Sequence, residues 1–94
     1  MKLRWTRVAI ADLDSAFECV AADDPSAAER LIGRMEQAAG ILSRHPSAGR
    51  TGRVSGTREL VVGGSPFVVA YRVRRGIVEI LAVIHGSRKW PEKL

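Results

Sequence analysis

Apolar residues in the first quarter of the chain recur at helical spacing. They begin after Thr6, a residue type that caps helices, and return every three or four positions, as on one face of an amphipathic helix. The acidic pair Asp23 and Asp24 interrupts them. The pattern predicts a helix from Thr6 to Asp23. Its apolar stripe is Ile10, Leu13, Phe17 and Val20.

A second, longer stripe follows at once. Asp24 suits the N-cap and Pro25 the first helical position, whereas Pro46 cannot continue a helix and His45 is expected to cap its end. Two helices joined so closely predict an antiparallel hairpin whose apolar faces need a partner layer. The stripe of the second helix is Ala28, Leu31, Ile32, Met35, Ala38, Ala39 and Leu42.

The second half has the pattern of a sheet. Runs rich in Val, Ile, Phe and Tyr occupy residues 57–62, 67–74 and 77–85, with short turns between them, and predict an antiparallel meander. The third run is almost wholly apolar, which is typical of a central strand covered on both faces. Alternation along the middle run predicts one face on the helices and one open to solvent. The open face would carry Val68, Ala70, Arg72 and Arg74.

These elements add up to one small fold. Residues 1–5 alternate apolar with basic side chains, as a short edge strand does. The expected order is therefore β-α-α-β-β-β. We predict an α+β fold in which the helical hairpin packs on a small, twisted, mainly antiparallel sheet, as a single domain spanning residues 1–94.

Composition narrows the function classes. The 94 residues are 46% hydrophobic and 27% charged, which excludes a disordered tail and a disulfide scaffold. We interpret the single Cys19 as a buried structural thiol. No apolar run approaches the ~18 residues of a membrane span. We expect a cytoplasmic protein without membrane contact, and the one Cys and two distant His predict no metal or cofactor.

Charge is distributed unevenly along the chain. Residues 1–43 carry a net charge of −2 and residues 44–94 a net charge of +7, within the total of +5. This asymmetry indicates a localised cationic surface, which suits nucleic acid or an acidic protein partner; a solvated charged face is the alternative. The candidate RNA- or partner-binding residues are Arg50, Arg53, Arg74, Lys89 and Trp90.

The candidate chemistry is cleavage of RNA through its own 2′-hydroxyl. That reaction needs a base, an acid and cations on the phosphate, and arginine can supply only the charge. His85 has a pKa suited to acid or base work, and Glu59 is either the base or a partner in a cross-strand ion pair. The expected phosphate-binding cations are Arg50, Arg58, Arg72 and Arg88, of which Arg58 and Arg72 share a face if the strand register allows.

Five sequence motifs in order give the chain a family resemblance. They are Trp5-Thr6 with Asp12-Leu13, Pro46 with Gly49-Arg50 after the second helix, GTRELVV at 56–62, PFVVAYRV at 66–73 and VEILAVIHGSR at 78–88, and they resemble the RelE/ParE superfamily of bacterial toxins. The resemblance covers nearly the whole chain and implies the β-α-α-β-β-β fold. It also implies the toxin of a type II toxin–antitoxin pair, bound by a cognate antitoxin whose own DNA-binding part contacts the operator.

The resemblance leaves two targets open. RelE-type members cut mRNA on the ribosome, and some rely on a histidine near the C-terminus, where His85 stands; others use an arginine where this chain has Val68. ParE-type members inhibit DNA gyrase by protein binding. We expect a metal-independent mRNA endoribonuclease, because the one suitable titratable group falls among cations. The alternative is a gyrase inhibitor that uses the same arginines as interface contacts.

Overall fold

Two antiparallel helices pack on one face of a five-stranded sheet in the computed structural model, which describes residues 1–94. The strand order is β1-β5-β4-β3-β2, with β1 parallel to β5 and the other pairs antiparallel. The predicted fold class is confirmed. The elements are β1 (Lys2–Trp5), α1 (Arg7–Asp23), α2 (Pro25–Arg44), β2 (Arg50–Thr51), β3 (Arg58–Val61), β4 (Phe67–Arg74) and β5 (Ile77–His85).

The capping residues define both helices as the sequence predicted. Thr6 Oγ1 accepts a hydrogen bond from the backbone of Ala9 (3.2 Å) and donates one to the carbonyl of Ile80 (2.9 Å), so it also fixes the start of α1 against β5. Asp24 Oδ1 accepts a bond from the backbone of Ala27 at 3.2 Å. The C-cap of α2 is His45. Neither helix combines the length and apolar character that crossing a membrane requires.

The central position of β5 is confirmed. It lies between β1 and β4, and its residues 78–83 are buried. Ala70 lies opposite Ala82, but the next residue, Tyr71, lies opposite Ile80, so Leu81 is an extra residue and forms a β-bulge. The two-residue β2 was not predicted; it lies in the segment after Pro46 that the sequence indicated as a loop.

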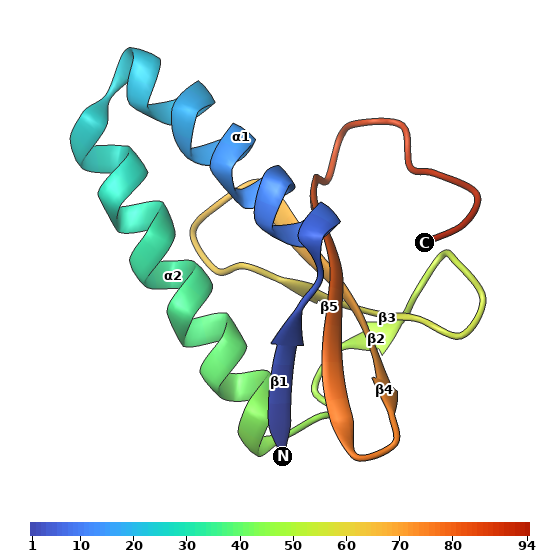
Figure 1. The fold of residues 1–94 in the computed structure, drawn as a ribbon. Helices are drawn as coiled ribbons and strands as arrows, with labels where there is room; N and C mark the ends of the chain where they lie inside the picture. The colour runs from blue at the N-terminus through green and yellow to red at the C-terminus, as the bar shows by residue number, and fades with distance from the viewer.

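The face of the sheet away from the helices, here called the outer face, is open to solvent as predicted only toward Arg72 and Arg74; at Val68 and Ala70 it is covered. Val68 is only 4% exposed and Ala70 is fully buried. Figure 1 shows the reason: residues 86–94 fold back on the side of the sheet opposite the helices, beside the loop before β3. This segment contains no helix or strand, so strand periodicity could not reveal the cover that it supplies.

Two expectations for α1 are also corrected. Its buried residues are Ala9 and Ala16, with Leu13 and Val20 packed beside them, while Ile10 is 48% exposed. Cys19 is exposed rather than buried. The connection between α1 and α2 projects beyond the sheet in Figure 1, so the end of α1 has α2 beside it but no strand beneath it.

A buried tyrosine fixes the segment between α2 and β3. Tyr71 is fully buried; its hydroxyl donates to the carbonyl of Pro46 (2.7 Å) and accepts from the backbone N–H of Gly49 (2.9 Å). A Cβ at Gly49 would lie 2.7 Å from the carbonyl oxygen of Glu59 and from the Tyr71 ring. Position 49 therefore requires glycine, and the tyrosine determines the path of the chain that leads to Arg50 and Arg53.

We predict that Tyr71→Phe lowers the free energy of unfolding by about 1–3 kcal/mol, because it leaves two backbone groups without their partner. Urea denaturation measures the change. Ser47→Ala, which removes an exposed hydroxyl from the same segment, is the matched control and should stay close to the parent. Equal stability of Tyr71→Phe and the parent would contradict the proposed role of the hydroxyl.

Candidate functional site

The ten predicted site residues do not form one site. They divide among β3 with the loop before it, the second half of β4, and the end of β5 with the segment that follows it. The sequence had implied a single cationic surface around His85. The structure instead uses several of the arginines to neutralise two buried carboxylates.

Glu59 lies in the first of these places. Its side chain is 1% exposed, and it accepts hydrogen bonds from Arg50 Nη2 (3.1 Å) and from the backbone N–H of Arg53 (2.7 Å). The Arg53 guanidinium also lies 4.0 Å from the ring centre of Trp90, which joins the C-terminal segment to this loop. Glu59 is thus in an ion pair, the alternative reading of this residue, and has no free oxygen facing solvent at which it could act as a base.

Glu79 of β5 lies opposite Arg72, in the second of these places. Arg72 Nε donates to one carboxylate oxygen at 2.8 Å, and Arg4 from β1 binds the other. The hydrogen bonds from Arg72 and then from Arg4 hold the pKa of Glu79 below its usual value of 4.5, against the opposing effect of burial. Arg72 is therefore committed to a contact within the sheet.

The strand register separates Arg58 from Arg72. Arg58 lies opposite Tyr71, so it is on the helix side of the sheet, whereas Arg72 is on the outer face. The Arg58 guanidinium donates to the carbonyl of Gly49 at 2.8 Å. The condition set on the strand register is not met, so the two arginines do not share a face. Arg74 is exposed near the end of β4.

His85 ends β5, far from these groups. It is six residues from Glu79 along one strand, about 20 Å at the usual rise per residue. Glu59 is two strands away and three residues along, on the order of 14 Å. His85 Nδ1 accepts a bond from the backbone N–H of Ser87 at 3.2 Å and lies 2.7 Å from the Ser87 hydroxyl oxygen, so this ring nitrogen is occupied by contacts with the turn that follows β5.

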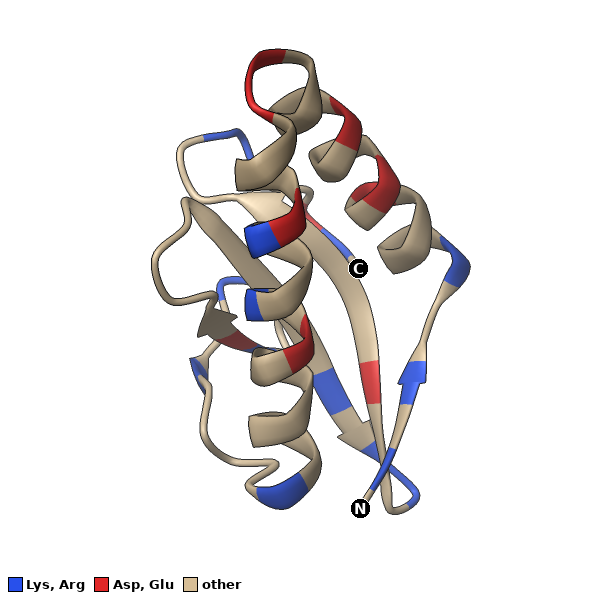
Figure 2. Ribbon diagram, turned by 90° about the vertical axis from the view of Figure 1, so that its left-hand side faces the viewer, with Lys and Arg blue, Asp and Glu red and all other residues tan.

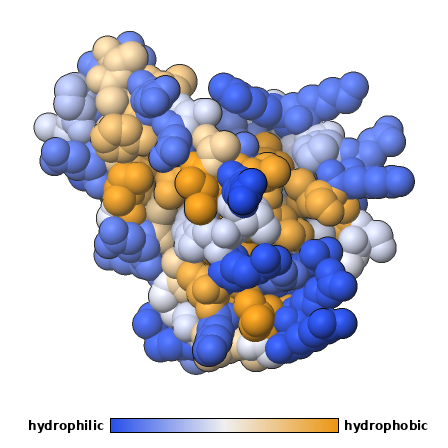
Figure 3. Space-filling model, viewed as in Figure 1, coloured by the Kyte–Doolittle hydropathy of each residue, from blue (hydrophilic) through white to orange (hydrophobic).

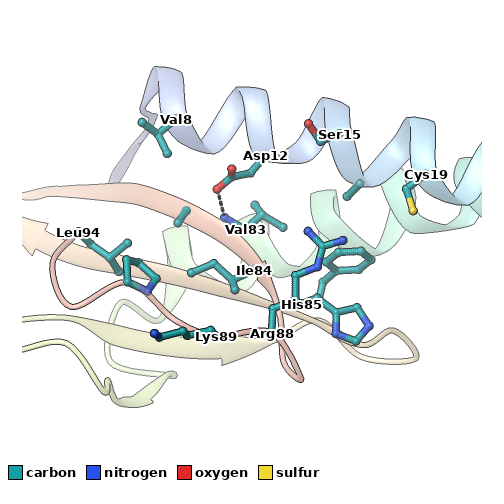
Figure 4. Close-up of a pocket in the computed structure, with 14 residues that line it drawn as sticks. Val8, Asp12, Ser15, Cys19, Val83, Ile84, His85, Arg88, Lys89 and Leu94 are labelled. Carbon is teal, nitrogen blue, oxygen red and sulfur yellow. Dashed lines mark hydrogen bonds between the residues drawn. The ribbon is translucent and has the colours of Figure 1, made fainter.

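A cleft of about 430 Å³ lies beside His85. Figure 4 shows its construction: side chains of α1 form one wall, the end of β5 the floor, and residues 88–94 the other wall. The cationic side chains that line the cleft are those of Arg88 and Lys89, and its lining includes one carboxylate, that of Asp12. Asp12 Oδ2 accepts a hydrogen bond from the backbone N–H of Val83 at 3.0 Å.

The surface around the cleft is mixed in character. Val8 of α1 is 61% exposed and lines the cleft with Leu94. Figure 3 shows apolar side chains exposed on this face among hydrophilic ones. Figure 2 shows acidic residues along the two helices, whereas basic ones occur mainly on strands and loops. The cleft thus combines an apolar lining with positive charge, which fits a peptide better than a phosphate backbone alone.

Sequence reasoning missed Asp12, Arg4 and Glu79. Asp12 lies off the apolar stripe and gave no sign that it reaches β5. Arg4 and Glu79 are 75 residues apart, and only the parallel register of β1 on β5 places them opposite each other. The alternation of residues 1–5 indicated a strand but not its partner. Nowhere do three or more His, Cys, Asp or Glu side chains gather as metal ligands.

Comparisons with known proteins agree on one family. The family model described as the ParE toxin of the type II toxin–antitoxin system parDE matches residues 3–90. The chain is 41% identical over 93 residues to the putative toxin Y4kP of Sinorhizobium fredii, covering 99% of this chain and 96% of that one. It is 37% identical over 84 residues to toxin RelE2 of Caulobacter vibrioides, covering 89% and 93%.

A solved structure shares the fold. A chain of the chromosomal ParDE toxin–antitoxin system from P. aeruginosa superposes with a TM-score of 0.81 at 30% identity, covering 90% of this chain and 95% of that chain. The fold, the length and the sequence of this chain therefore agree with those of the solved chain over almost the whole molecule.

The depressed pKa of Glu79 predicts a pH dependence of stability. The folded state keeps Glu79 ionised to lower pH than the unfolded chain, so its contribution is present above 4.5 and is lost as pH falls through the lowered folded value. Glu79→Gln should be less stable than the parent at neutral pH, and the gap should narrow below pH 4.5. Urea unfolding of both proteins, from neutral pH to below pH 4.5, measures this difference in the free energy of unfolding. Glu92→Gln, at an exposed carboxylate, is the control; a constant gap for Glu79→Gln would contradict the linkage.

Proposed function

The chain belongs to the ParE toxin family of type II toxin–antitoxin systems, and from this premise we propose that it acts by binding a protein, DNA gyrase. It performs no cleavage of RNA in this proposal. Membership in the family implies a cognate antitoxin that keeps the toxin inactive. Contact with operator DNA belongs to the antitoxin, and the toxin needs no cofactor.

The separation of the candidate catalytic groups carries this proposal. Glu59 is buried and ion-paired, Arg72 is bonded to Glu79, and His85 lies at the end of β5, away from both. A general acid and base must both reach the same substrate bond, within about 3 Å of the proton each transfers. Groups that stand on the order of 14–20 Å apart on a rigid sheet do not meet that condition. A protein-binding toxin has no such requirement.

The second candidate is the mRNA endoribonuclease expected from the sequence. One observation favours it: His85 shares its cleft with Arg88 and Lys89, so an acid and two cations line the same space. In that function a protonated His85 would give its Nε2 proton to the leaving 5′-oxygen, and the cations would neutralise the phosphate. The base would have to come from the ribosome or the RNA, because Glu59 is too distant.

Pulse labelling separates the two functions. When the chain is induced without its antitoxin, we expect thymidine uptake to fall within minutes while methionine incorporation continues. The purified chain should inhibit supercoiling by DNA gyrase in the same preparation. An early halt in protein synthesis with unimpaired supercoiling would favour the nuclease and overturn the proposal.

The variant His85→Gln gives an independent test. Loss of a general acid lowers a rate by about 10²–10⁴-fold. A side chain outside the centre of a protein interface changes affinity by less than about fivefold. We therefore expect His85→Gln to keep its growth-arrest activity within about fivefold of the parent. Folding of the variant is verified by thermal denaturation, and complete loss of toxicity in a folded variant would contradict the gyrase assignment.

A further inference from the structure

Basic side chains gather on the outer face at the end of the sheet near the N-terminus. Lys2 and Arg4 of β1 lie on one side of β5, and Arg72 and Arg74 of β4 lie on its other side at the same level. Glu79 lies between Arg4 and Arg72 on the outer face, so alternation along each strand places all four cations on that face. Figure 2 shows these basic segments with one acidic segment among them. We call this surface, with the turn that follows β4, the basic face; it consists of Lys2, Arg4, Arg72, Arg74 and Arg75.

The basic face carries more positive charge than the protein neutralises. The carboxylate among its cations is Glu79, which is bound by both Arg4 and Arg72. The other three cations form no ion pair with a carboxylate. Five cations against one carboxylate give a net charge of +4. Such a concentration of one sign attracts a partner with several negative charges.

The buried carboxylate also holds two of these cations in position. Arg72 donates to Glu79 through Nε at 2.8 Å, which leaves its two Nη groups for another partner, and its side chain is 35% exposed. Arg4 is bound by the same carboxylate and is 59% exposed. A guanidinium that is already fixed loses little conformational entropy when it binds an anion, and its remaining N–H groups suit phosphate oxygens. The contact within the sheet therefore prepares both arginines for a second contact outside it.

The turn between β4 and β5 holds a cation where the backbone disfavours one. Arg75 and Gly76 both have positive φ, at 53° and 74°, as in a two-residue type I′ hairpin turn, whose first position prefers Asn, Asp or Gly. Arg75 is the one non-glycine residue of the protein with positive φ. Its side chain is exposed, so packing does not require an arginine there. A strained residue that the fold does not need points to a function for its side chain.

The chemistry of the basic face suits a phosphate backbone better than a protein or a single strand. Its members are all lysine or arginine, whereas protein interfaces have an apolar or aromatic centre. Single-stranded nucleic acid binds by stacking its bases on aromatic side chains, and the aromatic residue nearest in sequence, Trp5, packs against the core instead. The cations of β1 and β4 are about 10 Å apart across β5, and that length of a DNA duplex carries about six phosphate charges.

We propose that the basic face binds the phosphate backbone of duplex DNA without reading its sequence. The toxin then contacts the DNA segment that gyrase holds, in addition to the enzyme itself; this second statement rests on the proposed function. The contact is separate from recognition of the operator, which belongs to the antitoxin. Its affinity comes from charge alone, so it must weaken steeply as salt is added.

The salt dependence of binding counts the phosphate contacts. Fluorescence anisotropy of a labelled duplex of mixed sequence should show an affinity that falls about 150-fold between 50 and 200 mM salt, as for four neutralised phosphates. Lys2→Gln with Arg74→Gln should bind more weakly at 50 mM and lose only about 12-fold over this range, because two contacts remain. The matched control is Arg7→Gln with Arg30→Gln, two exposed cations of the helices, and should behave like the parent. Equal salt dependence of the two double variants would overturn the inference.

The variant Arg75→Asn separates binding from folding. Asn adopts positive φ more readily than Arg, so the variant should unfold at a higher urea concentration than the parent. It also lacks one cation, so its affinity for the duplex should fall only about 40-fold between 50 and 200 mM salt. A variant that is more stable but keeps the salt dependence of the parent would overturn the assignment of Arg75 to the basic face.

The enzyme assay and a second probe separate this inference from the proposed function. Steeply salt-dependent duplex binding with unimpaired supercoiling supports the basic face and overturns the gyrase proposal alone. Inhibited supercoiling without duplex binding overturns this inference alone. Tighter binding of single-stranded RNA of equal length would overturn the choice of duplex DNA. If Lys2→Gln with Arg74→Gln loses the antitoxin but keeps the duplex binding of the parent, the surface contacts the antitoxin instead and the inference is overturned.

Discussion

The outer face of the sheet depends on the neutralisation of two buried carboxylates. Glu59 and Glu79 lie on β3 and β5 with side chains 1% and 8% exposed. An isolated carboxylate at such burial is very costly, and pairing with a guanidinium that also donates hydrogen bonds removes most of that cost. Each carboxylate is therefore bound by two arginines from different elements: Arg50 and Arg53 for Glu59, Arg4 and Arg72 for Glu79. These contacts tie β1 to the middle of the sheet and the loop before β3 to its edge.

The same pairing changes the meaning of the positive charge. A net charge of +7 in residues 44–94 indicated a cationic surface for nucleic acid, but several of those arginines contribute to folding. The cations that line an open cleft are Arg88 and Lys89, beside apolar side chains. A surface with few charges and a substantial apolar component is typical of peptide and protein recognition, whereas binding of a phosphate backbone uses many cations along a track. Part of the positive charge in the second half of the chain thus serves the internal structure.

Local signals predicted the elements that form through local interactions. Thr6, Asp24 and Pro25 fixed the helix starts because capping depends on neighbours in sequence, and the limits of β4 and β5 followed from composition and the Arg75-Gly76 turn. The predictions that failed concern contacts between residues that are far apart in the sequence. The exposure of Val68 depends on residues 86–94, and the face of Arg58 depends on a register that local alternation does not determine. Cys19 was misassigned because the reach of α1 beyond the sheet is a property of the whole fold.

The parallel pairing of β1 with β5 also governs when the molecule can fold. Arg4 and Glu79 are 75 residues apart in sequence, and β5 is the strand on which both β1 and β4 depend. At about 5–20 residues per second, a ribosome needs several seconds between making the first strand and the strand that it pairs with. Until then the sheet lacks the strand that joins β1 to β4, although β2, β3 and β4 can pair with one another. The fold can therefore be completed only after β5 has been made, and that interval is available for antitoxin to be supplied before the toxin is folded.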